Sequence, residues 1–270
     1  MDTSKPTRKT SPIAYSCYHS QNREGEQFAA EHVLSFQISG ILTLNNGSKE
    51  YIFNPGDFRF IRRNQLIKFI KQPDPNVAFQ SISIYLSQQA LRDYSIQYNQ
   101  KTNLIKSPET ETVFQLKETS LLKSFMNSLI PYINEDQLIN QELQNLKVNE
   151  AITILLQCNP ELKDILFDFS EPGKIDLEAF MKKNFHFNVQ LDRFAYLTGR
   201  SLATFKRDFQ RIFDNSPSRW LLQKRLQEAY YQIKERGKTP SEVYLEVGFE
   251  DLSHFSFAFK KQFGLPPSKI

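Results

Sequence analysis

The chain has 270 residues, of which 40% are hydrophobic and 24% charged, with a net charge of +4, so it can build a sizeable core and lacks the bias of a disordered or fibrous protein. Its two cysteines, Cys17 and Cys158, are too few for a disulfide framework and suit inert filling positions in a reducing cytoplasm. No segment reaches the roughly 20 apolar residues of a membrane helix, and the first ten residues lack the apolar stretch of a secretory signal, which argues against a membrane or secreted protein.

Residues 28–86 are predicted to form short strands. The segments 32–39 and 79–86 alternate apolar and polar residues with the period of two that marks a half-buried strand. Asn46 and Gly47 tolerate positive φ and separate two apolar stretches, which indicates a hairpin. Short strands with frequent turns predict a small barrel or sandwich, in which the aromatics either fill the core or line a ligand pocket: Phe36, Phe53, Phe58 and Phe60.

Helical periodicity replaces the strand pattern between about 119 and 158. Apolar residues there recur at three- and four-residue steps, which predicts amphipathic helices. Such stripes either pack on the strands or form a dimer interface. One stripe contains Leu121, Leu122, Phe125, Met126, Leu129 and Ile130, and the other contains Leu143, Leu146, Ala151, Ile154 and Leu155.

A linker is predicted at 170–175, between an N-terminal domain at 1–169 and a C-terminal domain at 176–270. Pro172 and Gly173 interrupt both periodicities there. The charge balance also changes sign: residues 174–270 contain 17 Lys and Arg against 11 Asp and Glu, and the rest contain 17 against 19. A basic C-terminal module is typical of polyanion binding, although a solvated basic face gives the same balance. Helices are predicted near 176–184, 190–198, 201–213, 217–236, 240–247 and 251–263.

The C-terminal domain repeats itself once at an offset of fifty residues. The N-cap residues Ser201 and Asp251 open the two copies. A repeat that keeps caps, buried aromatics and a terminal proline in register indicates two copies of one helical unit. Phe205, Phe209, Phe213, Pro217 and Ser218 of the first copy correspond to Phe255, Phe259, Phe263, Pro267 and Ser268 of the second.

Each copy has the outline of a helix-turn-helix. A short helix leads through a Gly-containing turn, at Gly199 or Gly248, into a second helix whose outer face is polar, and in the first copy strongly basic. In the first copy Asp208 is expected at the edge of that face, and the apolar stripe opposite it is predicted to contain Leu202, Phe205, Phe209, Ile212 and Phe213. Pro217 can start a connecting helix of about 20 residues, which spans roughly 30 Å. Because successive major-groove faces lie about 34 Å apart, one rigid helix can hold two reading helices in adjacent grooves.

The segment 241–268 closely resembles the C-terminal signature of the AraC/XylS family of bacterial transcription regulators; it reads SEVYLEVGFEDLSHFSFAFKKQFGLPPS. The resemblance extends over about 174–270 and includes SPSRWLLQKRLQEA at 216–229. It implies two helix-turn-helix subdomains, binding to promoter DNA and, in most members, activation through RNA polymerase. It also implies a cupin-like N-terminal domain that senses a small-molecule or protein effector, forms a homodimer, or does both. The predicted fold is therefore α+β, with a cupin-like barrel or sandwich, packed helices and an all-α reading domain.

Two positions depart from the family pattern. Tyr244 stands where members usually have Ala, so the local packing must differ. Phe257 stands where many have Arg, so the second unit is expected to read fewer bases directly, because Phe can only touch a thymine methyl or pack aside.

The outward residues of the two reading helices are the predicted DNA contacts. Arg207 and Lys206 lead the candidates for base edges, because Arg or Lys bound to guanine is the commonest specific contact. The full base-reading set is Ala203, Thr204, Lys206, Arg207, Ser253, His254, Ser256 and Phe257, and the phosphate set, which positions without specifying, is Arg211, Arg219, Lys260 and Lys261.

Two other functions compete with DNA reading. A cupin-type metal enzyme fused to a helical interaction module needs several histidines, yet the strand region contains only His32, which suits a structural role; no catalytic residue, metal site or cofactor is predicted. A DNA-repair methyl acceptor needs a reactive cysteine, and Cys17 lacks the accompanying cysteines.

Overall fold

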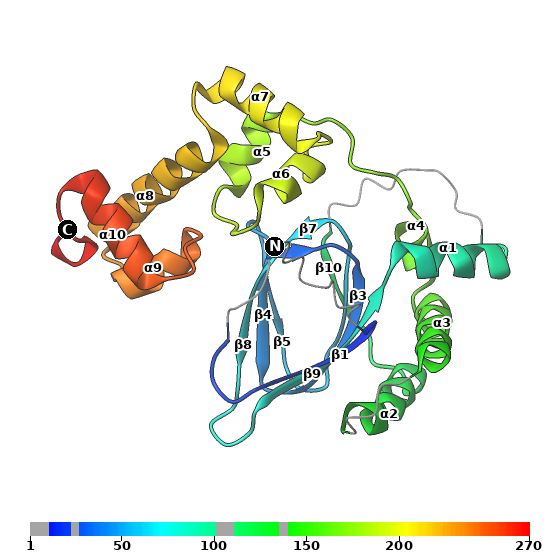
Figure 1. The fold of residues 1–270 in the computed structure, drawn as a ribbon. Helices are drawn as coiled ribbons and strands as arrows, with labels where there is room; N and C mark the ends of the chain where they lie inside the picture. The colour runs from blue at the N-terminus through cyan, green and yellow to red at the C-terminus, as the bar shows by residue number, and fades with distance from the viewer. Residues whose placement is uncertain (1–10, 23–26, 101–110, 135–139) are drawn as a thin grey trace, which may run out of the picture.

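The computed structural model describes residues 11–22, 27–100, 111–134 and 140–270, and the first ten residues, on which the absence of a secretory signal was predicted, lie outside these ranges. The fold is α+β: a barrel-like arrangement of strands carries helices on one side, and a purely helical C-terminal part lies over one end of it (Figure 1). No helix in the described ranges is long and apolar enough to cross a membrane.

The strands form antiparallel sheets around β3 (His32–Ser39), which pairs with β9 (Phe79–Leu86) and β6 (Phe58–Ile61). The predicted hairpin at Asn46 and Gly47 is confirmed, because Leu44 opposes Tyr51 and Gly47 has a φ of +86°. The sheet orders are β1-β9-β3-β6-β10, β5-β4-β8 and β2-β7, with β1 at Ile13–Tyr18, β2 at Phe28–Ala29, β4 at Ile41–Asn45, β5 at Glu50–Phe53, β7 at Gln65–Leu66, β8 at Lys68–Gln72 and β10 at Val113–Leu116.

Two strands lie outside the predicted strand region. β1 precedes it, and β10 follows the helix α1 (Gln88–Gln97), where the sequence pattern is no longer alternating. Both are edge strands of the five-stranded sheet, paired to β9 and to β6. An edge strand buries only part of its surface and carries a weak sequence pattern, so pairing with the sheet decides its conformation. Cys17 on β1 is exposed, so its predicted filling role is wrong.

Helices α1 to α4 cover the five-stranded sheet and share its core (Figure 1). The two predicted apolar stripes are only partly buried. Leu122, Phe125, Met126 and Leu129 lie in the core, whereas Leu121, Ile130 and Leu146 are exposed. Core filling is confirmed for Phe53, Phe58 and Phe60. The remaining elements here are α2 (Ser120–Asn134), α3 (Gln141–Cys158), a 3-10 turn (Pro160–Leu162) and α4 (Lys163–Leu166).

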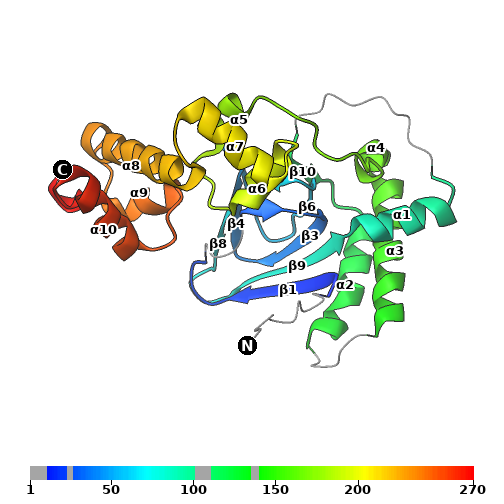
Figure 2. The same ribbon diagram turned by 45° about the horizontal axis from the view of Figure 1, so that its top comes forward.

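The C-terminal part contains the six predicted helices, each bound within one residue of the prediction. Two core clusters organise them: Phe205 and Phe209 are buried in the first, Phe255 and Phe259 in the second. Figure 2 shows α8 (Pro217–Arg236) running from the first group to the second. The helices are α5 (Leu177–Asn184), α6 (Leu191–Leu197), α7 (Leu202–Phe213), α8 (Pro217–Arg236), α9 (Pro240–Glu246) and α10 (Leu252–Phe263), followed by a 3-10 turn (Pro267–Lys269).

The barrel contacts both helical groups. Leu66 is buried in the core of the first, and the Gln27 side chain accepts a hydrogen bond from the Asn188 N–H at 2.9 Å. Lys68 on β8 donates from Nζ to the Glu246 carbonyl of the second at 2.5 Å. The N-terminal part therefore contacts both helical groups, so a movement of the barrel would change their positions.

Candidate nucleic-acid interface

The first helix-turn-helix consists of α6, a turn through Gly199, and α7. Gly199 has a φ of +64°, and a Cβ there would lie 2.4 Å from the backbone carbon of Gly173. Both the backbone conformation and this close approach therefore require glycine. Ser201 caps α7 by accepting from the Thr204 N–H at 3.3 Å. These features fix the point at which α7 begins and thus which residues face outward.

The outward face of α7 carries the predicted readers of the first unit. Ala203, Lys206 and Arg207 are exposed, and Thr204 is half-buried, with its hydroxyl accepting from the Ser201 hydroxyl at 3.0 Å. The expectation that Leu202 and Ile212 belong to the buried stripe is wrong: both are more than a third exposed, because the core closes around Phe205 and Phe209.

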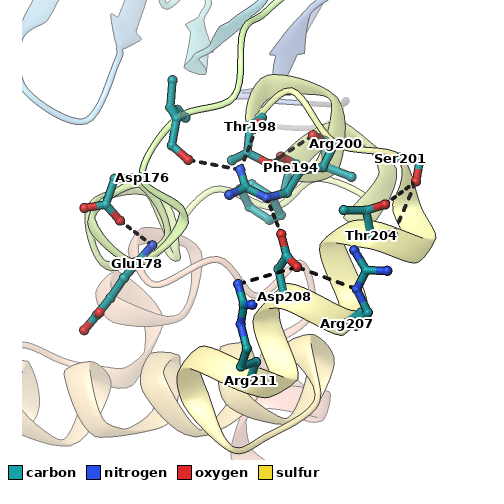
Figure 3. Close-up of polar contacts among 12 residues, drawn as sticks. Asp176, Glu178, Phe194, Thr198, Arg200, Ser201, Thr204, Arg207, Asp208 and Arg211 are labelled. Carbon is teal, nitrogen blue, oxygen red and sulfur yellow. Dashed lines mark hydrogen bonds and ion pairs between the residues drawn. The ribbon is translucent and has the colours of Figure 1, made fainter.

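Asp208 is the centre of a cationic cluster beneath this face (Figure 3). Its carboxylate accepts from Arg200 Nε at 3.1 Å, and both side chains are buried, with 6% and 7% of their surfaces exposed. The hydrogen bond from Arg200 lowers the pKa of Asp208 below its usual range. The expectation that Asp208 lies at the edge of the outer face is therefore wrong, because Arg200 from the preceding turn draws it inward.

Arg207 and Arg211 each lie 3.8 Å from the other Asp208 carboxylate oxygen. Their side chains are nonetheless 76% and 77% exposed, so their guanidinium groups remain available to an outside partner. Sequence reasoning missed this arrangement. The available signal was one acidic residue among three arginines of the turn and helix.

The second unit is built on the same plan from α9 and α10. Thr239 and Glu242 form a reciprocal capping box at the start of α9, and the Asp251 side chain accepts from the His254 N–H at 2.6 Å to open α10. Between them Gly248 has a φ of +98°. The predicted N-caps Ser201 and Asp251 and the predicted glycine-containing turns at Gly199 and Gly248 are thus confirmed.

The outward face of α10 is less basic than that of α7. Ser253 and Phe257 are exposed, Ser256 is half-buried, and the His254 ring packs against Phe249 with centroids 5.6 Å apart. Lys260 and Lys261 are exposed in the last turn of α10, as is Arg219 in the first turn of α8. The structure therefore places the predicted readers of each unit on one helix, with the phosphate candidates nearby in the chain.

Arg225 of α8 connects the two units directly. Its guanidinium donates to the carbonyls of Phe185 and Phe187, both at 2.8 Å, and to the carbonyl of Gly248 at 2.9 Å. The first two belong to the segment after α5, and the third to the turn of the second unit. Sequence reasoning did not single out Arg225, because nothing in a local pattern indicates carbonyl partners that lie 23 to 40 residues away.

The N-terminal part offers no obvious metal centre within the described residues, where no group of three or more His, Cys, Asp and Glu side chains is placed to hold an ion. His32 is buried, its Nδ1 accepts from the Arg63 N–H at 3.2 Å, and its ring stacks on Phe60. Burial lowers the pKa of His32 to about 3, which keeps the ring neutral. These contacts fit the structural role predicted for it.

An open cavity of about 1410 Å³ lies at the junction of the barrel, the segment 164–176 and α5. Its lining is mixed, with cations such as Arg62 and Lys183 and acids such as Glu111 and Glu171. It does not include the barrel aromatics Phe53, Phe58 and Phe60, which are packed in the core.

Family models match both parts of the chain, and curated regulators are similar to it in sequence. Residues 194–270 match a helix-turn-helix domain model, and residues 32–165 match the model of the ExsA N-terminal regulatory domain. The chain is 23% identical over 239 residues to the HTH-type transcriptional regulator ExsA of Pseudomonas aeruginosa, covering 86% of this chain and 83% of ExsA. It is 26% identical over 154 residues to the virulence regulon transcriptional activator VirF of Yersinia enterocolitica, covering 50% of this chain and 57% of VirF. Among solved structures, ToxT of Vibrio cholerae aligns over 95% of both chains at 11% identity with a TM-score of 0.40.

Proposed function

Because the chain belongs to the AraC/XylS family of transcription regulators, we propose that its two helix-turn-helix units read adjacent major grooves of one DNA duplex. The protein is a DNA-binding transcriptional regulator with an N-terminal regulatory domain. The observation that carries the two-groove proposal is the pair of repeated units joined by α8. Its 20 residues span roughly 30 Å, close to the groove repeat of about 34 Å.

The roles of individual residues follow from exposure and chemistry. Arg207 and Lys206 contact guanine edges, and Ala203 and Thr204 meet thymine methyls. In the second unit Ser253, His254 and Ser256 contact bases or phosphates, and Phe257 contributes at most an apolar contact. Arg211, Arg219, Lys260 and Lys261 bind phosphates and position the protein.

The regulator is proposed to activate transcription through contact with RNA polymerase. VirF and RhaS, two relatives that share about half of this chain, are both named as transcriptional activators. A protein that acts on chromosomal DNA in this way works in the cytoplasm. The competing assignment as a cupin-type metal enzyme receives no support from the relatives, which are transcription regulators, and we propose that the chain is not an enzyme.

The N-terminal domain, 1–169, is proposed to dimerise, to sense an effector, or to do both, and to join the reading domain, 176–270, through the linker 170–175. The exposed Leu121, Ile130 and Leu146 on α2 and α3 offer an apolar contact for a second copy. The cavity beside the linker offers room for a small molecule, and its walls come from both domains.

Selection of bound fragments from genomic DNA, followed by footprinting of the full-length protein, tests the central proposal. The expected result is protection of two patches about one helical turn apart within one site. Protection of a single short patch, or equal binding to all fragments, contradicts it.

A further inference from the structure

The two reading units meet beside the middle of α8, and Arg225 of α8 bridges them. Arg225 donates three hydrogen bonds there: two to the carbonyls of Phe185 and Phe187, in the α5–α6 segment that belongs to the core of the first unit, and one to Gly248 of the second unit. A guanidinium is the one side chain that offers donors in a rigid planar fork, so it holds three carbonyls at fixed angles to one another. Loss of Arg225 leaves the carbonyls of Phe185, Phe187 and Gly248 without the guanidinium of α8 that bridges them.

Two further observations place the units in contact at the same point. A Cβ on Gly248 would lie 2.8 Å from the His186 carbonyl oxygen and 2.9 Å from Arg225 Nε, so the turn of the second unit already touches the first. Beside it, Asn188 of the first unit donates from Nδ2 to the Glu250 carboxylate of the second at 2.5 Å. Arg225 therefore lies at the centre of a packed joint and is not an isolated surface contact.

These contacts restrict rotation of the second unit relative to the first. A connecting helix without them would allow more rotation. Adding one base pair between two half-sites moves the second by about 3.4 Å along the axis and turns it by about one-tenth of a turn. A protein whose two reading helices are fixed relative to each other loses affinity when either the distance or the rotation changes. A protein whose second unit can rotate about α8 keeps its affinity when the spacing changes.

We infer that Arg225 is a specificity-determining residue that acts by positioning: it sets the spacing and rotational phase of the two half-sites that the protein accepts. This inference rests on the proposed two-groove function, because it presupposes two half-sites. Arg225 touches protein carbonyls and reads no base itself. Its effect on DNA binding is thus expected on paired half-sites and not on single ones.

The test compares full-length wild type with Arg225→Met on the selected DNA site and on derivatives with one base pair added or removed between the half-sites. Wild type is expected to lose affinity about tenfold on either derivative. Because Met removes charge-assisted hydrogen bonds worth a factor of roughly ten or more, Arg225→Met is expected to bind the original spacing about tenfold more weakly. It should discriminate between the spacings by less than about threefold and bind a single half-site as wild type does.

Arg236→Met is the matched control, since it makes the same chemical change at an exposed position of the same helix. Asn188→Ala is the second test variant, because it removes only the more exposed Asn188–Glu250 bond and keeps the assay usable if Arg225→Met unfolds. It should weaken spacing discrimination in the same direction, by a smaller factor.

The outcomes separate this inference from the proposed function. If wild type itself is indifferent to spacing, the two-groove proposal fails. If wild type discriminates and Arg225→Met and Asn188→Ala discriminate equally well, only the role of the joint is overturned. A uniform loss on every DNA, half-site included, or the same behaviour in Arg236→Met, also overturns it.

Discussion

Arg207 and Phe257 occupy equivalent positions of the two reading helices, fifty residues apart, and both point into solvent, with 76% of the Arg207 side chain and 70% of Phe257 exposed. The scaffolds beneath them are alike, with paired phenylalanines and a side-chain N-cap in each unit. The chemistry presented to a partner differs: a charged fork of donors in one unit, an apolar ring in the other. The two units are therefore expected to contribute unequally to sequence recognition.

Replacement of Arg207 by Ala is expected to weaken binding to the selected site by about 1–3 kcal/mol and to relax the base preference at one position. The matched change, Phe257→Ala, should cost less and leave the preference nearly unchanged, because an apolar ring offers no hydrogen bond to a base. Gel-shift titration against all four bases at each position measures both. If Arg207→Ala binds the selected site with undiminished affinity, Arg207 does not contact a base.

Replacement of Lys261 by Ala is expected to weaken binding to every sequence alike. A lysine that binds a phosphate releases a counterion, so its loss should reduce the steepness of the salt dependence by nearly one unit of log K against log salt. Titrations between about 50 and 200 mM salt, on specific and random DNA, give this slope. A loss confined to the specific site assigns Lys261 to base reading instead.

Asp208→Asn is expected to destabilise the first unit, because Arg200 stays buried without its counter-charge. The folded-state pKa of Asp208 is lowered, so its carboxylate stabilises the fold above the unfolded pKa of about 3.9, and this contribution is lost as pH falls through the folded value. Thermal unfolding of wild type and variant should differ by several degrees near pH 7; the gap should begin to narrow below about pH 4 and close only below the lowered folded-state pKa. A gap that persists unchanged in acid rules out the charge as the cause.

Phe209→Ala and Phe259→Ala make the same deletion in the two units, and both rings are fully buried. Each is expected to lower the free energy of unfolding by about 3–5 kcal/mol. The footprint distinguishes them: Phe209→Ala should lose protection of one patch first and Phe259→Ala of the other. Loss of both patches together in either variant indicates that the units fold and bind as one body.

Local sequence signals predicted the helices and turns of the reading domain. Its caps, glycine turns and phenylalanine stripes are set by neighbours three or four residues away, so the bounds of α7, α8 and α10 could be predicted closely. The same signals placed Arg207 and Phe257 on outward faces, because helical periodicity decides most of the side that opposes the core. Periodicity failed for Leu202, Ile212 and Asp208, whose burial depends on tertiary contacts.

What only the tertiary structure decided involves partners distant in the chain. β1 and β10 become strands because β9 and β6 are there to pair with them. Asp208 turns inward because Arg200 meets it across the turn, and Arg225 joins two units through carbonyls that no side-chain pattern records. Backbone carbonyls are the same in every residue, so a sequence carries no mark of which of them a buried guanidinium will bind.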